Sequence, residues 1–254
     1  MFNSTSDREW EKFGENDPYF GVLTDDRFRK SNLTDDNKEK FFESGSKYID
    51  AVLETIRQHI DRTFTIKRAL DFGCGVGRLV IPLASVAQEV TGIDVSDSML
   101  NEAKKNCEAR LIRNVVLVKS DDNLSSLNGK YDFIHSYIVF QHIPVRRGER
   151  IFENLIAHLA SDGVCVVHFT YAKDSRRKGF VPFLNRYVPL YRNLVNLIKG
   201  RKFFAPHMQM NNYDLNHLFL TIQRANCPDF YTTFTDHAGA FGIVVYFKKP
   251  RALR

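Results

Sequence analysis

Short apolar runs alternate with stretches of helical periodicity between residues 65 and 172, and this alternation limits the fold more than any other feature. Strands that alternate with helices of about ten residues or more indicate a parallel sheet with helices packed on it. The strand-like runs are 68–72, 89–95, 114–120, 131–140 and 163–171. The helix-like stretches between them are 77–87, 97–111 and 148–160. We therefore predict an α/β fold, with Ser96 or Asp97 as the N-cap of the second of these helices.

The parts of the chain outside this alternation differ from each other. Residues 1–34 mix aromatic and acidic side chains without a period, and we expect an irregular arm that covers the site. Residues 35–60 repeat apolar positions at helical spacing, which predicts a helix. We predict one domain over residues 35–254, with the basic and aromatic segment 172–210 inserted in it as a lid.

The last strands have too short a connection to lie parallel. Residues 229–238 and 240–250 both read as strands, after a helix at 213–225, and Gly239 and Gly242 lie at or near their junction. Parallel neighbours need a crossover of a dozen residues or more, so these two strands are expected to form a hairpin at the sheet edge.

Three glycines follow the first strand at every second position, in the stretch ALDFGCGVGRLV. In an open α/β sheet, ligands bind at the carboxyl ends of strands where the strand order reverses. Glycine lets the backbone approach a ligand closely, and a following helix offers unpaired N–H groups. The loop therefore predicts a cofactor site rather than a tight turn alone, although its GxGxG spacing differs from the GxGxxG of dinucleotide folds.

Carboxylates end the first three strands. Asp94 ends the second strand, where it can accept hydrogen bonds from two ribose hydroxyls or, alternatively, cap the next helix. Asp121 and Asp122 follow the third strand and are suited to an adenine amino group, with a solvated loop as the alternative. Asp71 precedes the glycines and is placed to face an ammonium group.

Four motifs in this order and spacing, ALDFGCGVGRLV, TGIDVS, VKSDD and YDFIHSYIVFQHIP, resemble the class I S-adenosylmethionine-dependent methyltransferases. The resemblance covers about residues 65–172. It implies a Rossmann-like sheet of seven strands, mostly parallel with an antiparallel edge strand, and helices on both faces. It also implies S-adenosylmethionine as cofactor and S-adenosylhomocysteine as product. The outer segments resemble bacterial methyltransferases of glycan and secondary-metabolite pathways.

The resemblance also implies which residues contact the cofactor. They are Asp71, Gly73, Cys74, Gly75, Asp94, Val95, Asp121, Asp122, Ser136 and Tyr19. No metal is expected, because the sequence has no His, Asp, Glu or Cys cluster at metal-ligand spacing.

His142 is our first candidate for a general base if the methyl acceptor is a hydroxyl. It follows the fourth strand in FQHIP, and an imidazole with its ordinary pKa near 6.5 takes a proton at neutral pH without extensive tuning. Alternatively, His142 packs the loop or caps the following helix. His135 and His168 are expected to be packed inside strands.

The cysteine pattern and the distribution of charge indicate the cellular compartment and the kind of partner. The four cysteines form no CxxC pair, and the N-terminus has no basic start followed by an apolar stretch, so we expect free thiols in a cytoplasmic protein. Residues 172–212 carry nine Lys or Arg and one Asp. This charge suits an anionic acceptor, a contact with an anionic membrane surface, or a solvated face. No run of about 18 apolar residues predicts a membrane span.

These features predict a methyltransferase that acts on a small molecule or glycan, at a hydroxyl or an amine. One alternative is methylation of RNA or protein. Amino-directed nucleic-acid enzymes are disfavoured because SYIVFQH stands where an NPPY-like tetrapeptide would follow the fourth strand. Another alternative is a regulatory module that binds the cofactor without turnover. The sequence does not predict the oligomeric state.

Overall fold

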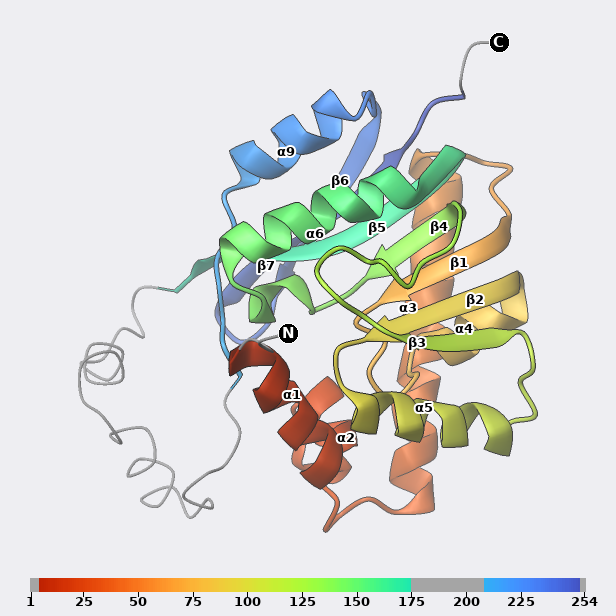
Figure 1. The fold of residues 1–254 in the computed structure, drawn as a ribbon, viewed down its shortest axis with the longest axis vertical. Helices are drawn as coiled ribbons and strands as arrows, with labels where there is room; N and C mark the ends of the chain where they lie inside the picture. The colour runs from red at the N-terminus through yellow and green to blue at the C-terminus, as the bar shows by residue number, and fades with distance from the viewer. Residues whose placement is uncertain (1–4, 175–207, 252–254) are drawn as a thin grey trace.

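A seven-stranded sheet forms the centre of the molecule, in the order β3-β2-β1-β4-β5-β7-β6 (Figure 1). The computed structural model describes residues 5–174 and 208–251. The strands are β1 (Ile66–Phe72), β2 (Ala87–Asp94), β3 (Val115–Lys119), β4 (Tyr131–Ser136), β5 (Leu159–Lys173), β6 (Phe230–Asp236) and β7 (Ala240–Lys248). β1 to β5 pair in parallel, whereas β7 is antiparallel to both β5 and β6. The predicted fold class is confirmed, with β7 one position in from the edge.

Helices cover both faces of this sheet, and each face has its own apolar core. On one face pack α3 (Asp35–His59), α4 (Val80–Val86) and α5 (Asp97–Ala109). On the other pack α6 (Val145–His158) and α9 (Leu215–Arg224). Inward positions alternate along the strands, so Ala69 faces the first core and Leu70 the second. The predicted helices at 35–60, 97–111, 148–160 and 213–225 are therefore present.

Local capping explains where two of these helices begin. The Thr34 hydroxyl accepts a hydrogen bond from the N–H of Asn37 at 3.2 Å, and α3 starts at the next residue. The Ser96 hydroxyl accepts from the N–H of Met99 at 3.1 Å, so Ser96 rather than Asp97 is the N-cap of α5. A hydroxyl in this place satisfies a backbone donor that the helix leaves unpaired.

The N-terminal arm is helical, so the expectation of an irregular segment is wrong. It forms α1 (Thr5–Asn16), α2 (Pro18–Val22) and the short 3₁₀ helix η1 (Asp26–Phe28). Trp10 and Phe13 are three residues apart and lie on one face of α1, within an apolar cluster that includes Phe41 and Met99. The arm is short and rich in charge, so its helical period shows only in the packed structure.

The predicted lid lies largely outside the described residues. β5 extends to Lys173, and residues 175–207 contain most of segment 172–210. The described chain resumes at residue 208. There the N–H of Asn211 donates to the carbonyl of Gln141, in the loop after β4, at 2.7 Å.

Candidate functional site

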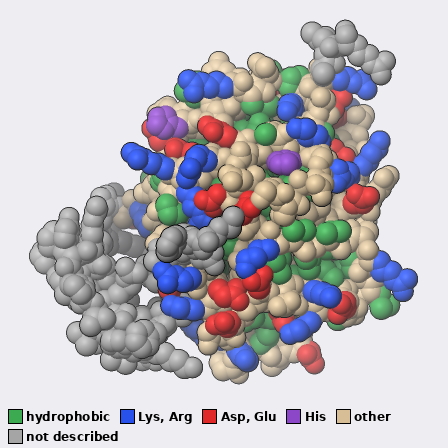
Figure 2. Space-filling model, in the orientation of Figure 1, with side chains coloured by type: hydrophobic (Ala, Val, Ile, Leu, Met, Phe, Trp, Pro, Cys, Tyr) green, Lys and Arg blue, Asp and Glu red, His purple; other side chains and the backbone are tan. Residues whose placement is uncertain are grey.

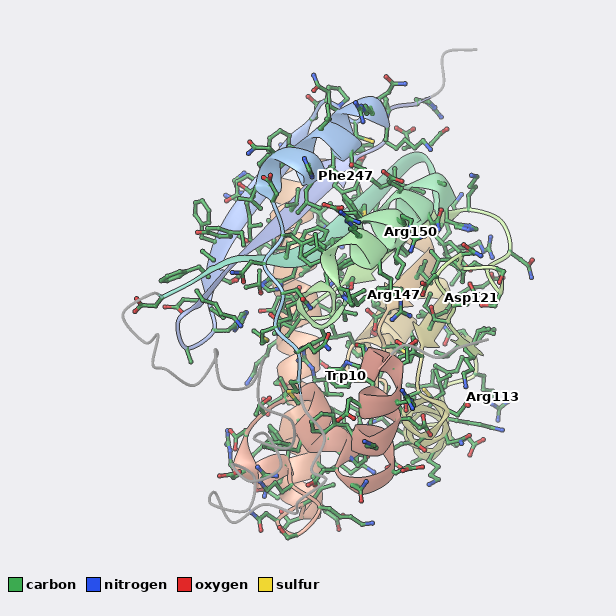
Figure 3. The ribbon with its side chains drawn as sticks, turned by 60° about the vertical axis from the view of Figure 1, so that its left-hand side comes forward. Trp10, Arg113, Asp121, Arg147, Arg150 and Phe247 are labelled. Atoms are coloured by element: carbon green, nitrogen blue, oxygen red, sulfur yellow. The ribbon has the colours of Figure 1, made fainter. Side chains whose placement is uncertain are left out.

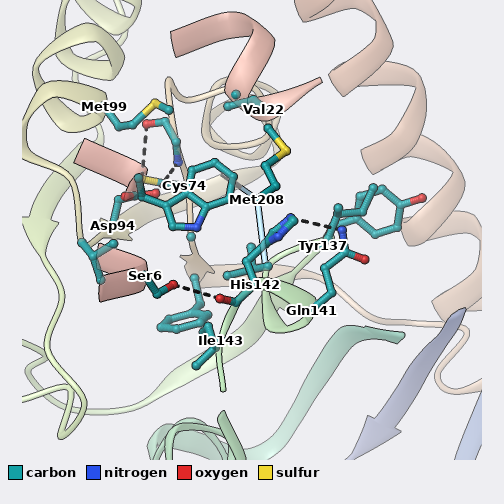
Figure 4. A pocket seen from close by; sticks show the side chains of 18 of the residues that line it. Ser6, Val22, Cys74, Asp94, Met99, Tyr137, Gln141, His142, Ile143 and Met208 are labelled. Carbon is teal, nitrogen blue, oxygen red and sulfur yellow. Dashed lines mark hydrogen bonds between the residues drawn. The ribbon is translucent and has the colours of Figure 1, made fainter. Parts of the chain in front are cut away.

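A cavity of about 630 Å³ opens at the carboxyl ends of the parallel strands. The loops that follow β1, β2, β3 and β4 contribute to its wall, together with residues from α1, α2, the stretch 208–210 and the turn between β6 and β7. β1 lies between β2 and β4, so the strand order reverses at the cavity. This is the position at which open α/β sheets bind ligands. Figure 4 shows side chains from these loops converging on one space.

The glycine loop has the backbone conformation that its composition predicts. The helix after it begins later than the predicted residue 77. Gly73, Gly75 and Gly77 have φ of 76°, 51° and 86°, a region that other residues rarely adopt. A side chain at Gly73 would overlap Val139, and one at Gly75 would lie 2.7 Å from a methyl of Val22. The loop therefore needs glycine both for its conformation and for close packing.

The N–H groups of this loop are used within the protein. Those of Gly73 and Cys74 donate to the carbonyl of Ile93 at 2.8 and 3.0 Å, and that of Gly75 donates to the Asp94 carboxylate at 2.9 Å. α4 begins only at Val80. The N–H groups of Gly73, Cys74 and Gly75 therefore join β1 to the end of β2, and the expectation that the start of α4 presents free N–H groups to a ligand stays a prediction.

Asp94 is the carboxylate best placed for hydroxyl groups. One oxygen accepts the N–H of Gly75 and the other accepts the N–H of Ser96, each at 2.9 Å. Each carboxylate oxygen has a further lone pair, and the residue lines the cavity. Burial raises the pKa of Asp94 from 3.8 to about 6, although these hydrogen bonds act in the opposite direction. Donation from two ligand hydroxyls would stabilise the charged form.

Asp121 and Asp122 line the same cavity with their carboxylates already engaged. Asp121 accepts the hydroxyl of Ser125 and the N–H groups of Asn123 and Ser125, and the Ser125 hydrogen bonds lower its pKa. Asp122 accepts from the Arg147 Nε at 2.7 Å. The adenine contact predicted for this pair stays a prediction, and the Asp121 hydrogen bonds show how the loop keeps its shape.

A chain of buried polar groups begins at Asp71. Its carboxylate lies 2.9 Å from His135 Nδ1, and His135 Nε2 lies 3.2 Å from the Tyr48 hydroxyl on α3. Asp71 is 2% exposed and still lines the cavity. The imidazole thus holds the carboxylate at the end of β1, and His135 is packed inside its strand as predicted.

The arm helix α1 forms one wall of the cavity. Both nitrogens at the end of the Arg147 guanidinium donate to the Asp7 carboxylate, at 2.6 and 2.9 Å. One turn further along α1, Glu11 accepts from the Ser98 hydroxyl at 2.6 Å. Figure 3 labels Trp10 on α1, Arg147 on α6 and Asp121 in the loop after β3, three elements that meet at this edge of the sheet.

His142 lines the cavity (Figure 4), and both of its ring nitrogens form hydrogen bonds. Its Nδ1 lies 2.7 Å from the carbonyl oxygen of Gln209, and its Nε2 lies 3.1 Å from the side-chain nitrogen of Gln141. A carbonyl only accepts, so we assign the proton to Nδ1 and the lone pair to Nε2. The Gln141 oxygen accepts from Thr170 at 2.6 Å, which directs its NH₂ group to Nε2.

Burial lowers the pKa of His142 to about 4. The expectation of an imidazole with its ordinary pKa is therefore wrong, because the ring is 6% exposed and packs against Trp10 with a centroid separation of 4.9 Å. The neutral ring still has the tautomer that a base needs, with its lone pair on Nε2.

Tyr19 and Ser136 do not line the cavity, and their assignment to the cofactor site stays a prediction. The Tyr19 hydroxyl lies 2.9 Å from both Glu102 and Asn106 on α5, and the residue packs among Phe41 and its neighbours. The Ser136 hydroxyl donates to the carbonyl of Phe72 at 3.0 Å and is buried between strands. The remaining predicted cofactor residues, including Cys74 and Val95, all line the cavity.

Replacing Tyr19 by phenylalanine tests the assignment of Tyr19 to the cofactor site. The change removes the hydroxyl that is within hydrogen-bonding distance of both Glu102 and the buried Asn106, so we expect the free energy of unfolding to fall by about 1–3 kcal/mol. Urea denaturation measures that loss. Binding of the expected cofactor should not change, and a clear loss of affinity in the folded variant would support the assignment.

Many residues of the cavity wall were not predicted from the sequence, and three of them carry polar groups with possible chemical roles: Arg78, Tyr137 and His237. Tyr137 and His237 approach each other, with 3.5 Å between the hydroxyl and Nε2. His237 belongs to the turn before β7, so its position depends on where the antiparallel strand joins the sheet. Arg78 directly follows the glycine loop, so its place in the sequence could have indicated that it lies near the cavity.

Among the residues 5–174 and 208–251, no group of three or more His, Cys, Asp or Glu is arranged to hold a metal ion. In that same part of the chain, each helix is too short or too polar to cross a membrane.

Comparison with known proteins relates the centre of the chain to one family. Residues 69–163 match the family described as "Methyltransferase domain". This range begins in β1 and ends in β5, so it contains the glycine loop, Asp94, Asp121 and His142.

The curated relatives match part of their length. A magnesium protoporphyrin IX methyltransferase of Arabidopsis thaliana is 30% identical over 161 residues, which are 63% of this chain and 45% of that protein. A magnesium-protoporphyrin O-methyltransferase of Synechocystis is 36% identical over 91 residues, 36% of this chain and 38% of that protein. A ubiquinone biosynthesis O-methyltransferase of Rickettsia akari is 26% identical over 119 residues, 47% of this chain and 46% of that protein. The chain spans less than half the length of each.

Solved structures share the fold over nearly the whole chain. The magnesium protoporphyrin IX methyltransferase of Synechocystis PCC 6803 with bound SAH superposes with a TM-score of 0.59 at 19% identity, covering 98% of this chain and 96% of that one. The N-methyltransferase NodS of Bradyrhizobium japonicum, in complex with S-adenosyl-L-homocysteine, gives 0.58 at 13% identity, covering 98% and 100%. At these identities the likeness concerns the fold.

Proposed function

We propose that the chain is a class I S-adenosylmethionine-dependent methyltransferase that transfers a methyl group from this cofactor to a small molecule. The match of residues 69–163 to a methyltransferase domain family supports the proposal, as does the shared fold of a methyltransferase solved with bound SAH. The observation that carries the proposal is the Asp94 carboxylate, which lies at the end of β2 beside the glycine loop and faces a cavity of about 630 Å³. That volume is in the range of small-ligand sites.

The wall of the cavity suits each part of the cofactor. Asp94 would accept the ribose hydroxyls, the loop with Asp121 and Asp122 would flank the adenine, and Asp71 with Gly73 would border the methionyl end. When bound, the sulfonium supplies a methyl group that is already activated for transfer. The protein then has to align the acceptor and exclude water, and α1 with Trp10 is the proposed cover.

For a hydroxyl acceptor, we propose that His142 takes the proton. The carbonyl of Gln209 holds Nδ1–H, so the lone pair of Nε2 is available once the acceptor hydroxyl replaces the Gln141 amide as its donor. An amine acceptor that is neutral at the working pH would attack without this step. Relatives named as O-methyltransferases favour an oxygen acceptor over an amine.

The finer choice of acceptor is also a proposal. Relatives named for magnesium protoporphyrin and for ubiquinone biosynthesis favour a small molecule over RNA or protein. On the face in Figure 2, basic and acidic side chains of the described residues are interspersed, which does not favour a nucleic-acid surface. A glycan or an anionic acceptor would suit the basic residues of segment 172–210.

Four buried free thiols are compatible with the cytoplasm.

Thermal melting with added ligands tests the cofactor. A ligand at 100 times its dissociation constant stabilises the fold by about 2.7 kcal/mol, so S-adenosylmethionine and S-adenosylhomocysteine should each raise Tm by several degrees. NAD is the control, because the loop lacks the dinucleotide spacing. A shift with NAD alone would overturn the cofactor assignment.

Turnover separates an enzyme from a regulatory module. With a radiolabelled methyl donor, we expect label in at least one class of a panel containing phenols, porphyrin carboxylic acids, amines and nucleotide-linked sugars. Tight cofactor binding without transfer to any class would favour the module.

A further inference from the structure

Arg78 places a buried guanidinium in the cavity wall. The residue follows Gly77 in the loop after β1 and is 6% exposed. α3 packs directly on its backbone, where a side chain at Gly45 would overlap the Arg78 carbonyl. The backbone of Arg78 is therefore fixed, and its side chain reaches the cavity from a rigid element.

The charge of Arg78 has no acidic partner among the described residues. Its Nε is buried without a hydrogen bond, and one terminal nitrogen donates to the Ser44 hydroxyl at a long 3.4 Å. Asp71 is close enough to raise the pKa of Arg78, but one of its oxygens is held by His135. Burial acts in the opposite direction and is the larger effect, so the pKa of Arg78 is lowered from its ordinary value.

An unpaired buried guanidinium is costly. Arginine is almost never buried without a partner, since taking its charge out of water has to be offset by another charge and by hydrogen bonds. The face of Tyr48 lies 6.0 Å from the Arg78 carbon Cζ, at the outer limit for a favourable cation–π contact. Packing against Tyr48 therefore does not replace the missing anion.

We infer that Arg78 binds the carboxylate of a ligand held in this cavity. A guanidinium presents two parallel N–H donors that match the two oxygens of a carboxylate, and such pairs are strong when water is excluded. This inference rests on the proposed function, which offers two sources of that group. One is the amino-acid end of the cofactor, because Arg78 shares the cavity with Asp71 and Gly73. The other is a carboxylate on the acceptor.

Calorimetric titration of Arg78→Met tests the inference, because methionine keeps the length of the side chain without its charge. Arg113→Met, at an exposed position before β3, is the matched control. The ligands are S-adenosylhomocysteine and its decarboxylated analogue, which keeps the amino group. Sodium benzoate and benzamide, titrated in the presence of S-adenosylhomocysteine, probe the acceptor side.

If the cofactor is the source, Arg78→Met weakens S-adenosylhomocysteine about 10–100-fold and leaves the decarboxylated analogue unchanged. Arg78→Lys should restore part of the affinity. If the acceptor is the source, the variant keeps both affinities and loses the preference for benzoate over benzamide. Equal losses for the two cofactor ligands, or no loss in any titration, overturn the inference.

The design separates this inference from the proposed function. Wild-type protein that does not bind S-adenosylhomocysteine refutes the cofactor, whereas Arg78 is judged by differences between ligands with and without a carboxylate. If Arg78→Met does not fold, the wild type still decides the question. A carboxylate site would be contradicted if the wild type bound S-adenosylhomocysteine as tightly as its decarboxylated analogue, and also bound benzoate as tightly as benzamide.

Discussion

Replacement of His142 by glutamine is expected to lower kcat for a hydroxyl acceptor by about 10²–10⁴-fold, the usual contribution of a general base. Glutamine can form a hydrogen bond in the same place but cannot accept the proton. The dissociation constant of S-adenosylhomocysteine should stay near the wild-type value, since the proposed cofactor contacts come from other loops. Steady-state kinetics and calorimetry measure the two quantities on the same preparation.

The pH profile of the wild type gives a second readout for His142. A base acts in its deprotonated form, so activity is lost as pH falls through its pKa, which burial has lowered to about 4. We therefore expect kcat/KM to be flat from about pH 6 to 9, with no inflection near the ordinary value of 6.5. An inflection near 6.5 that disappears in the variant would contradict a lowered pKa of His142 in the enzyme before the acceptor binds.

Two further histidine variants serve as comparisons. His217 is exposed on α9 and pairs with Glu149, so His217→Gln should keep wild-type kinetics. His237 lines the cavity and lies beside Tyr137, so a large loss in His237→Gln, with none in His142→Gln, would assign the base to His237. Wild-type kcat in both would favour an amine that attacks unaided.

Replacement of Asp94 by alanine should weaken binding of S-adenosylhomocysteine by at least about 100-fold. Two hydroxyl donors to a charged acceptor contribute about 1.5–3 kcal/mol each, and both are lost. The same carboxylate accepts the N–H groups of Gly75 and Ser96, so some loss of stability is also expected. Calorimetry gives the affinity, and thermal melting shows that the variant is folded.

Ser96→Ala is the control that separates these effects. It removes the N-cap of α5 beside Asp94, which costs about 0.5–2 kcal/mol of stability, but Ser96 does not line the cavity. We expect its affinity for S-adenosylhomocysteine to be unchanged. If both variants lost the same amount of affinity for S-adenosylhomocysteine, the role of Asp94 would be to stabilise the loop rather than to contact the ligand.

The pH dependence of binding adds a test without mutation. Hydroxyl groups donate to the ionised carboxylate, and the pKa of Asp94 in the free protein is about 6. Affinity for S-adenosylhomocysteine should therefore fall as pH drops below 6, by up to about tenfold per pH unit. Asp94→Ala should abolish this dependence, and a wild-type affinity that is constant from pH 7 to 5 would contradict the assignment.

Local residue order was enough to predict the α/β sheet and the loops after β1, β2 and β3 that line the cavity. Alternating strand and helix periods come from local residue order, and short connections exclude parallel pairing of the last two strands. Parallel strands bring their carboxyl ends to one edge, so the glycine loop, Asp94 and Asp121 were predicted to meet from their positions after strands. The cavity contains all three.

Only the tertiary structure decided which side chains reach the cavity and in what chemical state. The hydroxyl of Tyr19 is bound to Asn106, 87 residues away, and the His142 ring is held by Gln209, 67 residues away. The unpaired charge of Arg78 likewise depends on how α3 packs over the loop. Burial and hydrogen-bond partners set pKa and orientation, and both arise from contacts between distant segments that no local pattern records.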